Sequence, residues 1–364
     1  MTQYYYSCDN DKKLIEKSFN NIAFLLFGKN NKVSIEAIRE YFETKVSQVN
    51  IYPQGTTTKY VNDKYPGICR LDENEKIIIE MLGYKGAKKD KYSWIKHEGT
   101  HEFAHAFIHL LSQIMSKNPQ GIIKNGVLYK NHMGMIKESD AVTGKPVGQH
   151  YYGKMYNETM MDIISSMAIN CFDSITSSTS VDDILNSNYN SWGNEITGYS
   201  LFTSITRLTI AAFSNNGFIN YQNAVDAGLK IFNGTTKMQN GEIYMINDFL
   251  YGIVYDPLHI EKEFDKIEGE GNYRILCEYL DRLFLTYLDE QKLPEDQVKL
   301  VMDTLPDFLN KKLNYYQKNG IINNEGASKI ISNFNRIWNA MQTEYGAYFS
   351  GEEISDIARR SGRI

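Results

Sequence analysis

The sequence of 364 residues contains few cysteines and no excess of basic residues. Its four cysteines form no C-x-x-C pair and are too few for a disulfide framework in a chain of this length, so we expect reduced, mostly buried thiols. Lys and Arg together number 39 against 44 for Asp and Glu, and the formal net charge is -5. This balance argues against nucleic acid and anionic membranes as partners.

Long apolar segments are also absent. No segment reaches the roughly 18 consecutive apolar residues of a membrane span, and the N-terminus lacks a basic region followed by an apolar one. We therefore expect a soluble protein. A leader removed before this sequence begins would leave no trace, so the compartment, cytoplasmic or exported, stays open. The oligomeric state stays open as well.

Periodic apolar patterns predict helices and strands in the first part of the chain. Helical spacing predicts two opening helices, over about 14–26 and 34–46. Short β-prone segments between Gly, Pro and Asn-Asp signals predict a small sheet over about 49–84. The clearest strand is KIIIEML at 76–82, which is either an edge that pairs with an extended substrate or a plain core strand.

The middle of the chain is expected to carry two further helices. A proline-free stretch over about 90–117 places its apolar residues on one side and its histidines on another, which predicts a central helix facing a polar cavity. Gly-rich sequence at 118–153 predicts a hairpin and loops, and the next helix is expected over about 155–171.

Helical periodicity dominates beyond residue 199. It predicts helices in SLFTSITRLTIAAF, NAVDAGLKIF, NYRILCEYLDRLFLTYL, DQVKLVMDTLPDFLNKKL and SKIISNFNRIWNAMQ. These helical stretches are separated or interrupted by Pro257, Pro294 and Pro306. A capping box of Ser350 with Glu353 predicts a last short helix. We therefore predict an α+β region at 1–198 and a helical domain at 199–364.

An H-E-x-x-H pentad lies in the expected central helix, from His101 to His105. Side chains four residues apart on a helix share a face at about 5–6 Å, so both imidazoles can bind one zinc ion. Glu102, one step along, points at the water that the metal activates. The pattern therefore predicts a catalytic zinc site with Glu102 as the general base.

A second motif, NETMMD, follows on the next predicted helix. Glu158 and Asp162 stand four residues apart and share a face. A catalytic zinc usually has three protein ligands and one open position, so Glu158 can be the third ligand. Asp162, one turn on, is placed to accept the free N–H of a ligating histidine and to fix its tautomer.

Together, HEFAH and NETMMD resemble the signature of the gluzincin metallopeptidases, the thermolysin-like clan, which is H-E-x-x-H followed by N-E-x-x-x-D. The resemblance implies that Glu102 is catalytic, that Asp162 supports His101, and that Zn2+ is bound by His101, His105 and Glu158. It also implies a zincin-like catalytic domain with a small mixed sheet and a central active-site helix. A mainly helical C-terminal domain would complete the cleft.

The spacing between the two motifs is wider than in the most compact gluzincins. Glu158 follows His105 by 53 positions, and an inserted hairpin or loop over the site is one explanation.

Two alternative interpretations of the histidines stay open. The stretch from His97 to His101 is also H-E-x-x-H, but Gly99 would weaken a helix interior there, so we favour the His101/His105 frame. His109 is expected to be a polar neighbour. Histidines and carboxylates on solvated helix faces would be the default for either motif alone, whereas two motifs in the right order favour a metal site.

The predicted activity is that of a zinc-dependent metallopeptidase acting on a peptide or protein substrate. Glu102 would take the proton of the attacking water and pass it to the leaving amine. Gluzincins usually add a Tyr or His that stabilises the oxyanion. The candidates for this role are His150, Tyr151, Tyr152, Tyr244, Tyr251, Tyr255 and His259.

Two other functions would use the same residues. A narrow-specificity processing or toxin-like protease would need the same site. From a different class, the chain would be a zinc-binding regulatory or interaction protein with little or no peptidase activity. Glu102 argues against a purely structural zinc, which prefers four protein ligands and needs no base.

Overall fold

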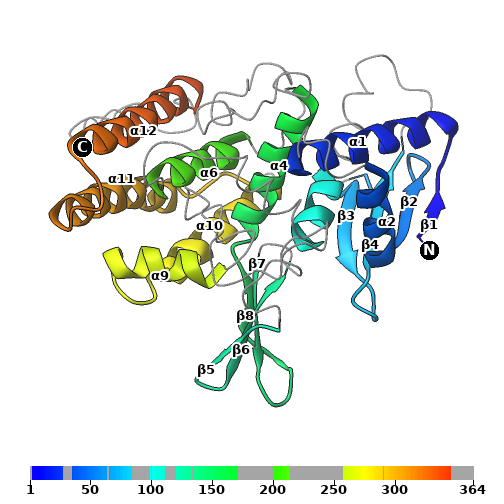
Figure 1. Cartoon of the computed structure of the whole chain (residues 1–364), viewed down its shortest axis with the longest axis horizontal. Helices are drawn as coiled ribbons and strands as arrows, with labels where there is room; N and C mark the ends of the chain where they lie inside the picture. The colour runs from blue at the N-terminus through cyan, green and yellow to red at the C-terminus, as the bar shows by residue number, and fades with distance from the viewer. Residues whose placement is uncertain are drawn as a thin grey trace.

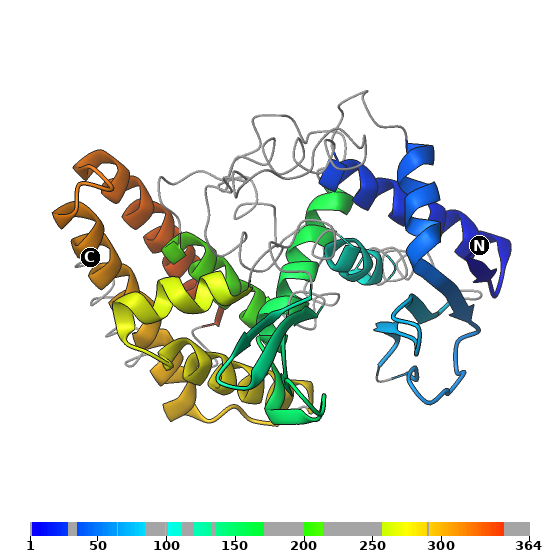
Figure 2. The ribbon, with the colours of Figure 1, turned by 60° about the horizontal axis from the view of Figure 1, so that its bottom comes forward.

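The computed structural model describes residues 2–27, 35–63, 65–83, 99, 101–110, 120–132, 135–170, 200–213, 257–289 and 291–345. These residues form a mixed α/β structure with two small sheets and long helices. Figures 1 and 2 show the first sheet at one end, the C-terminal helices at the other, and α4 between them. The helical stretches predicted for NAVDAGLKIF and for the segment after Ser350 lie outside the described residues, as does the boundary at 198.

The first sheet contains β1 (Gln3–Tyr5), β2 (Val46–Tyr52), β3 (Gly67–Leu71) and β4 (Ile77–Leu82) in the order β1-β2-β4-β3. The strands β1, β2 and β4 are parallel, and β3 pairs antiparallel with β4. This confirms the small sheet expected over 49–84. The alternative of KIIIEML as the sheet edge is wrong, because β2 and β3 pair with the two sides of β4 and all six of its residues are buried. The described edge on that side is β3.

Three helices near this sheet share a cluster of phenylalanines. The helices are α1 (Asp9–Phe27), α2 (Ile35–Lys45) and the helical residues 101–110, so both opening helices are confirmed. The ring of Phe19 lies 5.0 Å from that of Phe42, 5.8 Å from Phe103 and 5.4 Å from Phe107. This cluster fixes the apolar face of helix 101–110. The flanks of the predicted 90–117 helix lie outside the described residues.

The second sheet is an antiparallel meander of β5 (Ile122–Lys124), β6 (Val127–His132), β7 (Met135–Asp140) and β8 (Pro146–Tyr152). It projects away from the body below α4 in Figure 1. The sequence predicted only a hairpin and loops here. Few of these residues are buried, so the strands lack the apolar alternation that announces a half-buried sheet.

The remaining described elements are helices: α4 (Lys154–Asn170), α6 (Ser200–Phe213), α9 (Pro257–Glu268), α10 (Asn272–Leu288), α11 (Glu295–Lys318) and α12 (Asn324–Tyr345). The helix expected over 155–171 and four of the C-terminal helices are thereby confirmed. Pro257 opens α9 and Pro294 precedes α11, as the pattern indicated. Pro306, however, lies inside α11 and does not end it. Among the described residues, no helix is both long and apolar enough to span a membrane.

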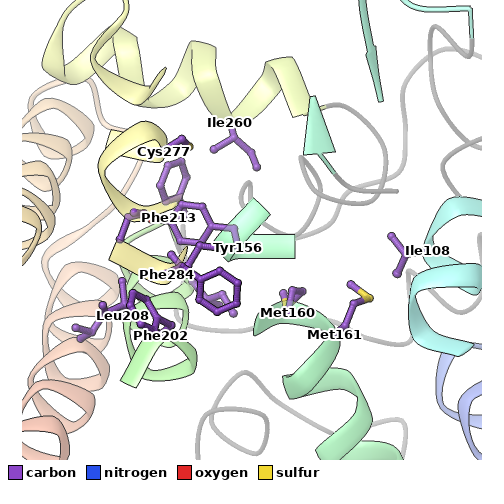
Figure 3. Packing of buried hydrophobic residues seen from close by; sticks show 14 of the residues in the cluster. Ile108, Tyr156, Met160, Met161, Phe202, Leu208, Phe213, Ile260, Cys277 and Phe284 are labelled. Atoms are coloured by element: carbon purple, nitrogen blue, oxygen red, sulfur yellow. The ribbon is translucent and has the colours of Figure 1, made fainter. Parts of the chain in front are cut away.

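One buried apolar cluster runs through both parts of the chain. Figure 3 shows Tyr156 of α4 near residues of α6 and α10, and Met161 on the side of α4 toward Ile108. The helix that carries the second motif is therefore packed against the helix of the first motif on one side and the C-terminal helices on the other. The described cysteines, Cys8, Cys69 and Cys277, form no disulfide, as expected, but of these three only Cys277 is buried.

Candidate metal centre

The helix at 101–110 presents its two faces to different surroundings. All ten residues are buried, and the phenylalanine cluster holds one face. Gly99, just before it, is in close contact with α1, because a Cβ at that position would lie 2.8 Å from Ile15 Cδ1. A glycine that looked unfavourable for a helix thus leaves room for the Ile15 side chain of α1. His101 and His105 lie on the face toward α4 and are 4% and 6% exposed.

α4 brings the residues of the second motif to these histidines. Glu158 Oε2 lies 3.4 Å from His101 Nε2 and 3.4 Å from His105 Nε2. The two Nε2 atoms are 3.1 Å apart. His101, His105 and Glu158 therefore form a group of ligand atoms that can hold a metal ion. The Glu158 side chain is 24% exposed, so the group is open to solvent on its side.

The three interatomic distances can be compared with those required by a metal. In a tetrahedral zinc site with bonds of about 2.0–2.1 Å, neighbouring ligand atoms are about 3.3–3.4 Å apart. The observed 3.1, 3.4 and 3.4 Å match this spacing closely. Two imidazoles and one carboxylate also form a ligand set of catalytic zinc sites. The donor atoms present fit a zinc ion without rearrangement of either helix.

Asp162 contacts the outer side of the same group. Its Oδ1 lies 3.1 Å from His101 Nδ1, and the residue is 1% exposed. A carboxylate here favours a proton on Nδ1, which leaves Nε2, on the side of Glu158 and His105, as the nitrogen that would bind a metal. The structure thus brings Asp162 to the one imidazole nitrogen that a metal would not use.

The charges of the group shift its pKa values in opposite directions. Burial lowers the pKa of His101, but hydrogen bonds to Asp162 and Glu158 outweigh it and raise that pKa well above its ordinary value. Burial dominates at His105 and lowers its pKa. Burial would raise the pKa of Glu158, yet the neighbouring His105 and His101 hold it well below its usual range. Without a metal, hydrogen bonds with Asp162 and Glu158 thus favour the protonated form of His101.

Glu102 lies beside the ligand group and close to the first sheet. It is 5% exposed. The pKa of the Cys69 thiol in β3 is raised well above its usual value by burial and then by the charges of Glu102 and Glu158. Cys69 of the edge strand β3 is therefore near two carboxylates that also influence the histidine pair.

The oxyanion candidates have different positions. Tyr152 is buried at the end of β8, and its hydroxyl donates to Glu261 Oε2 of α9 at 2.7 Å, so its proton is held away from a substrate. Tyr151 in the same strand is half-buried, and burial raises its pKa. His259 is half-buried in α9. The backbone of His150 lies in β8, but its side chain is outside the described part of the chain, as are Tyr244, Tyr251 and Tyr255.

The competing frame is only partly visible. His97 and Glu98 lie outside the described residues, whereas His101 and His105 are both in contact with Glu158. His109, one turn further along, is 5% exposed.

Sequence reasoning missed Asp281 of α10, whose carboxylate accepts hydrogen bonds from the first turn of α4. More than 120 residues separate the partners, and no local pattern signals such a contact.

Comparison with protein-family models, curated proteins and solved structures finds no match for this chain.

Proposed function

We propose that this protein is a zinc-dependent metallopeptidase of the gluzincin type, with a zincin-like arrangement around helix 101–110 and α4. The observation that carries the proposal is the set of distances among His101, His105 and Glu158, which match a tetrahedral zinc site. The contact of Asp162 with His101 supports it, because zinc-binding histidines commonly donate their second N–H to a carboxylate.

Each residue of the centre would have a distinct role in peptide hydrolysis. When bound, zinc supplies Lewis-acid polarisation of the scissile carbonyl and lowers the pKa of water toward about 7. Glu102 takes a proton from the attacking water on a carboxylate oxygen and passes it to the leaving amine. Asp162 keeps the Nδ1 proton of His101 in place, and Glu158, whose side chain is 24% exposed, is the ligand at which a substrate would reach the group.

The edge strand β3 supports a peptide substrate in particular. It pairs with β4 on one side, and its Cys69 is close enough to Glu102 and Glu158 for their charges to raise the thiol pKa. An extended peptide that adds to a sheet edge places its own backbone alongside that strand. A scissile bond held there would lie beside the proposed base.

The same donor set also occurs in other sites. Two histidines and one carboxylate bind non-haem iron in oxygenases, and a regulatory protein could keep zinc without catalysis. Glu102 favours hydrolysis over both, because a carboxylate beside the ligands is needed as a base and has no place in a closed structural site. Metal identity and the effect of Glu102 therefore decide between the three functions.

The test combines metal analysis with peptide hydrolysis. The full chain is purified, its metal content is measured by mass spectrometry, and cleavage of a mixed peptide library is followed with added Zn2+. We expect one zinc per chain and cleavage that Glu102→Gln reduces by at least about a thousandfold, with zinc retained. Glu73→Gln, in an exposed turn, is the matched control and should change neither property.

Three outcomes would contradict the proposal. Stoichiometric iron would indicate oxygenase chemistry. Bound zinc with no effect of Glu102→Gln on any cleavage would favour a regulatory zinc protein. Unchanged zinc affinity in Glu158→Ala would remove the third ligand and with it the metal centre as assigned.

A further inference from the structure

We propose that Asp281 of α10 is a positioning residue for the metal centre: it fixes the first turn of α4 and thereby the place of Glu158 opposite the two histidines. This inference rests on the metal centre of the proposed function. It concerns a residue that is distant in sequence from both motifs and lies in the C-terminal helical part of the chain.

The contact itself is a buried, two-point hydrogen bond. Asp281 Oδ2 accepts from the backbone N–H of Gly153 at 3.0 Å, and Oδ1 accepts from the N–H of Met155 at 2.8 Å. Asp281 is 8% exposed and Met155 is fully buried. Both oxygens of one carboxylate are thus engaged at the start of one helix, which fixes that helix in rotation as well as in position.

The start of α4 needs an acceptor from elsewhere. The first N–H groups of a helix have no intrahelical partner and are normally capped by a preceding side chain. Here Gly153 precedes the helix, with a φ of 84° that turns the chain from β8 directly into α4. Glycine has no side chain to cap with. The carboxylate of Asp281 satisfies these groups and also lies favourably at the positive end of the helix dipole.

The cap lies close to Glu158, the proposed metal ligand on α4, and can therefore influence the geometry of the metal centre. Glu158 is three residues beyond Met155, a rise of about 4.5 Å, and Asp162 is one turn further. Loss of the cap lets the first turn of α4 fray or shift. Metal sites tolerate displacements of only about 0.5 Å before affinity falls. Because Glu158 is the proposed ligand on α4, a shift of this helix would displace Glu158 from the two histidines.

The same face of α10 also holds the strand that leads into α4. Arg274 lies seven residues before Asp281, two helical turns, and therefore on the same face. Its Nη2 is 2.8 Å from Glu138 Oε1 of β7, and its guanidinium carbon is 5.1 Å from the ring centroid of Tyr152 in β8. Tyr152 in turn donates to Glu261 of α9. α10 thus contacts the end of β8 through Arg274 and the start of α4 through Asp281.

A matched control exists in the same part of the chain. Asp265 of α9 accepts from the N–H groups of Gly271 and Tyr273 at 2.7 and 2.8 Å, and so caps α10 in the way that Asp281 caps α4. Removal of either carboxylate takes away two hydrogen bonds at a helix start. Of these two carboxylates, it is Asp281 that caps the helix that carries Glu158.

The experiment measures metal affinity rather than activity. Zn2+ binding to the full chain is measured at pH 7.5 by competition with a chromophoric chelator, and the visible absorption of the Co2+-loaded protein reports ligand geometry. We expect Asp281→Ala to weaken zinc affinity by about tenfold, the lower end of the loss for groups that support metal ligands, and to alter the Co2+ spectrum. Asp265→Ala should change affinity by less than about twofold.

A conservative variant separates positioning from general loosening. Asp281→Asn keeps one acceptor oxygen, so its affinity should lie between those of the wild type and Asp281→Ala, and it also decides the matter if the alanine variant does not fold. Thermal unfolding of the metal-free proteins should show similar losses for Asp265→Ala and Asp281→Ala.

The failures are distinguishable. If the wild type binds neither Zn2+ nor Co2+, the metal centre of the proposed function is overturned, and this inference with it. If the wild type binds zinc but the Asp281 variants bind it equally well, the metal centre stands and the positioning role is overturned. Equal losses of affinity in the Asp265 and Asp281 variants would also overturn it, because the effect would then be general destabilisation.

Discussion

His101 is the residue at which the two motifs meet. Its Nδ1 contacts Asp162, and its Nε2 contacts both Glu158 and His105. Because a carboxylate favours the proton on Nδ1, Nε2 is the nitrogen of His101 that would bind a metal. His105 lacks such a raised pKa, since burial dominates there. The two imidazoles thus have unequal roles, and His101 is common to both overlapping H-E-x-x-H frames.

The choice of frame can be tested residue by residue. His105→Ala should abolish zinc retention through dialysis, because it removes an atom 3.1 Å from His101 Nε2 and 3.4 Å from Glu158 Oε2. His97→Ala should leave most of the zinc in place. Metal content per chain after dialysis is the measurement. The reverse pattern would move the base from Glu102 to Glu98.

At the scale of elements, α4 joins the two parts of the chain. Its Tyr156 hydroxyl lies 3.0 Å from Thr209 Oγ1 of α6, and Thr159 Oγ1 lies 2.6 Å from Thr206 Oγ1 of the same helix. Asp281 adds the cap from α10. α4 therefore has buried polar contacts with two C-terminal helices and, on its other side, with His101. These polar contacts, which apolar periodicity does not predict, help to hold α4 between the two parts of the chain.

The pair of threonine hydroxyls between α4 and α6 should be coupled. Thr159 and Thr206 are both fully buried, so Thr159→Val or Thr206→Val leaves the other hydroxyl without this partner and should cost about 1–3 kcal/mol. The double variant should cost less than the sum of the two, by about 0.5–2 kcal/mol. Urea unfolding of the four proteins measures this, with Thr304→Val as a control, because Thr304 is half-buried and its hydroxyl makes a solvent-exposed hydrogen bond to the Leu300 carbonyl. Strict additivity would show that the two hydroxyls do not interact.

At the scale of the whole molecule, the proposed ligands all come from the first part of the chain, while the helices of the second part hold one of the ligand-bearing helices. One buried cluster includes Phe103 and Phe107 from the first part and Phe202 and Phe284 from the second. Stability of the whole fold and geometry of the metal centre are therefore linked through α4 and its contact with Asp281.

This link predicts how stability depends on pH. Burial raises the pKa of Asp281 from 3.8 to about 6, while Lys154 of α4 and backbone N–H groups lower it. Because the folded state holds this proton more tightly, the part of the stability that comes from protonation of Asp281 is complete below about pH 3.8 and is lost as the pH rises through about 6.

The comparison that isolates this effect uses a variant that cannot titrate. Between pH 7.5 and 5, the metal-free wild type should gain roughly 1–2 kcal/mol in free energy of unfolding relative to Asp281→Asn. Urea unfolding of both proteins at the two pH values measures it. Parallel pH profiles would contradict the raised pKa of this carboxyl.

The sequence by itself determined the features that depend on local spacing. Apolar periodicity determined α1, α2, α4, α6, α10, α11 and α12, but it did not predict α9. The four-residue steps from His101 to His105 and from Glu158 to Asp162 determined which side chains share a helix face. These follow from the geometry of a single helix and need no partner.

Only the tertiary structure decided what depends on partners far along the chain. It placed β4 inside its sheet, folded the polar 122–152 segment into a meander, tolerated Pro306 within α11 and brought Asp281 to the start of α4. Each of these depends on contacts between segments that are distant in sequence. No local pattern specifies such a partner, because the free energy that selects it comes from packing and hydrogen bonds made only when the chain is folded.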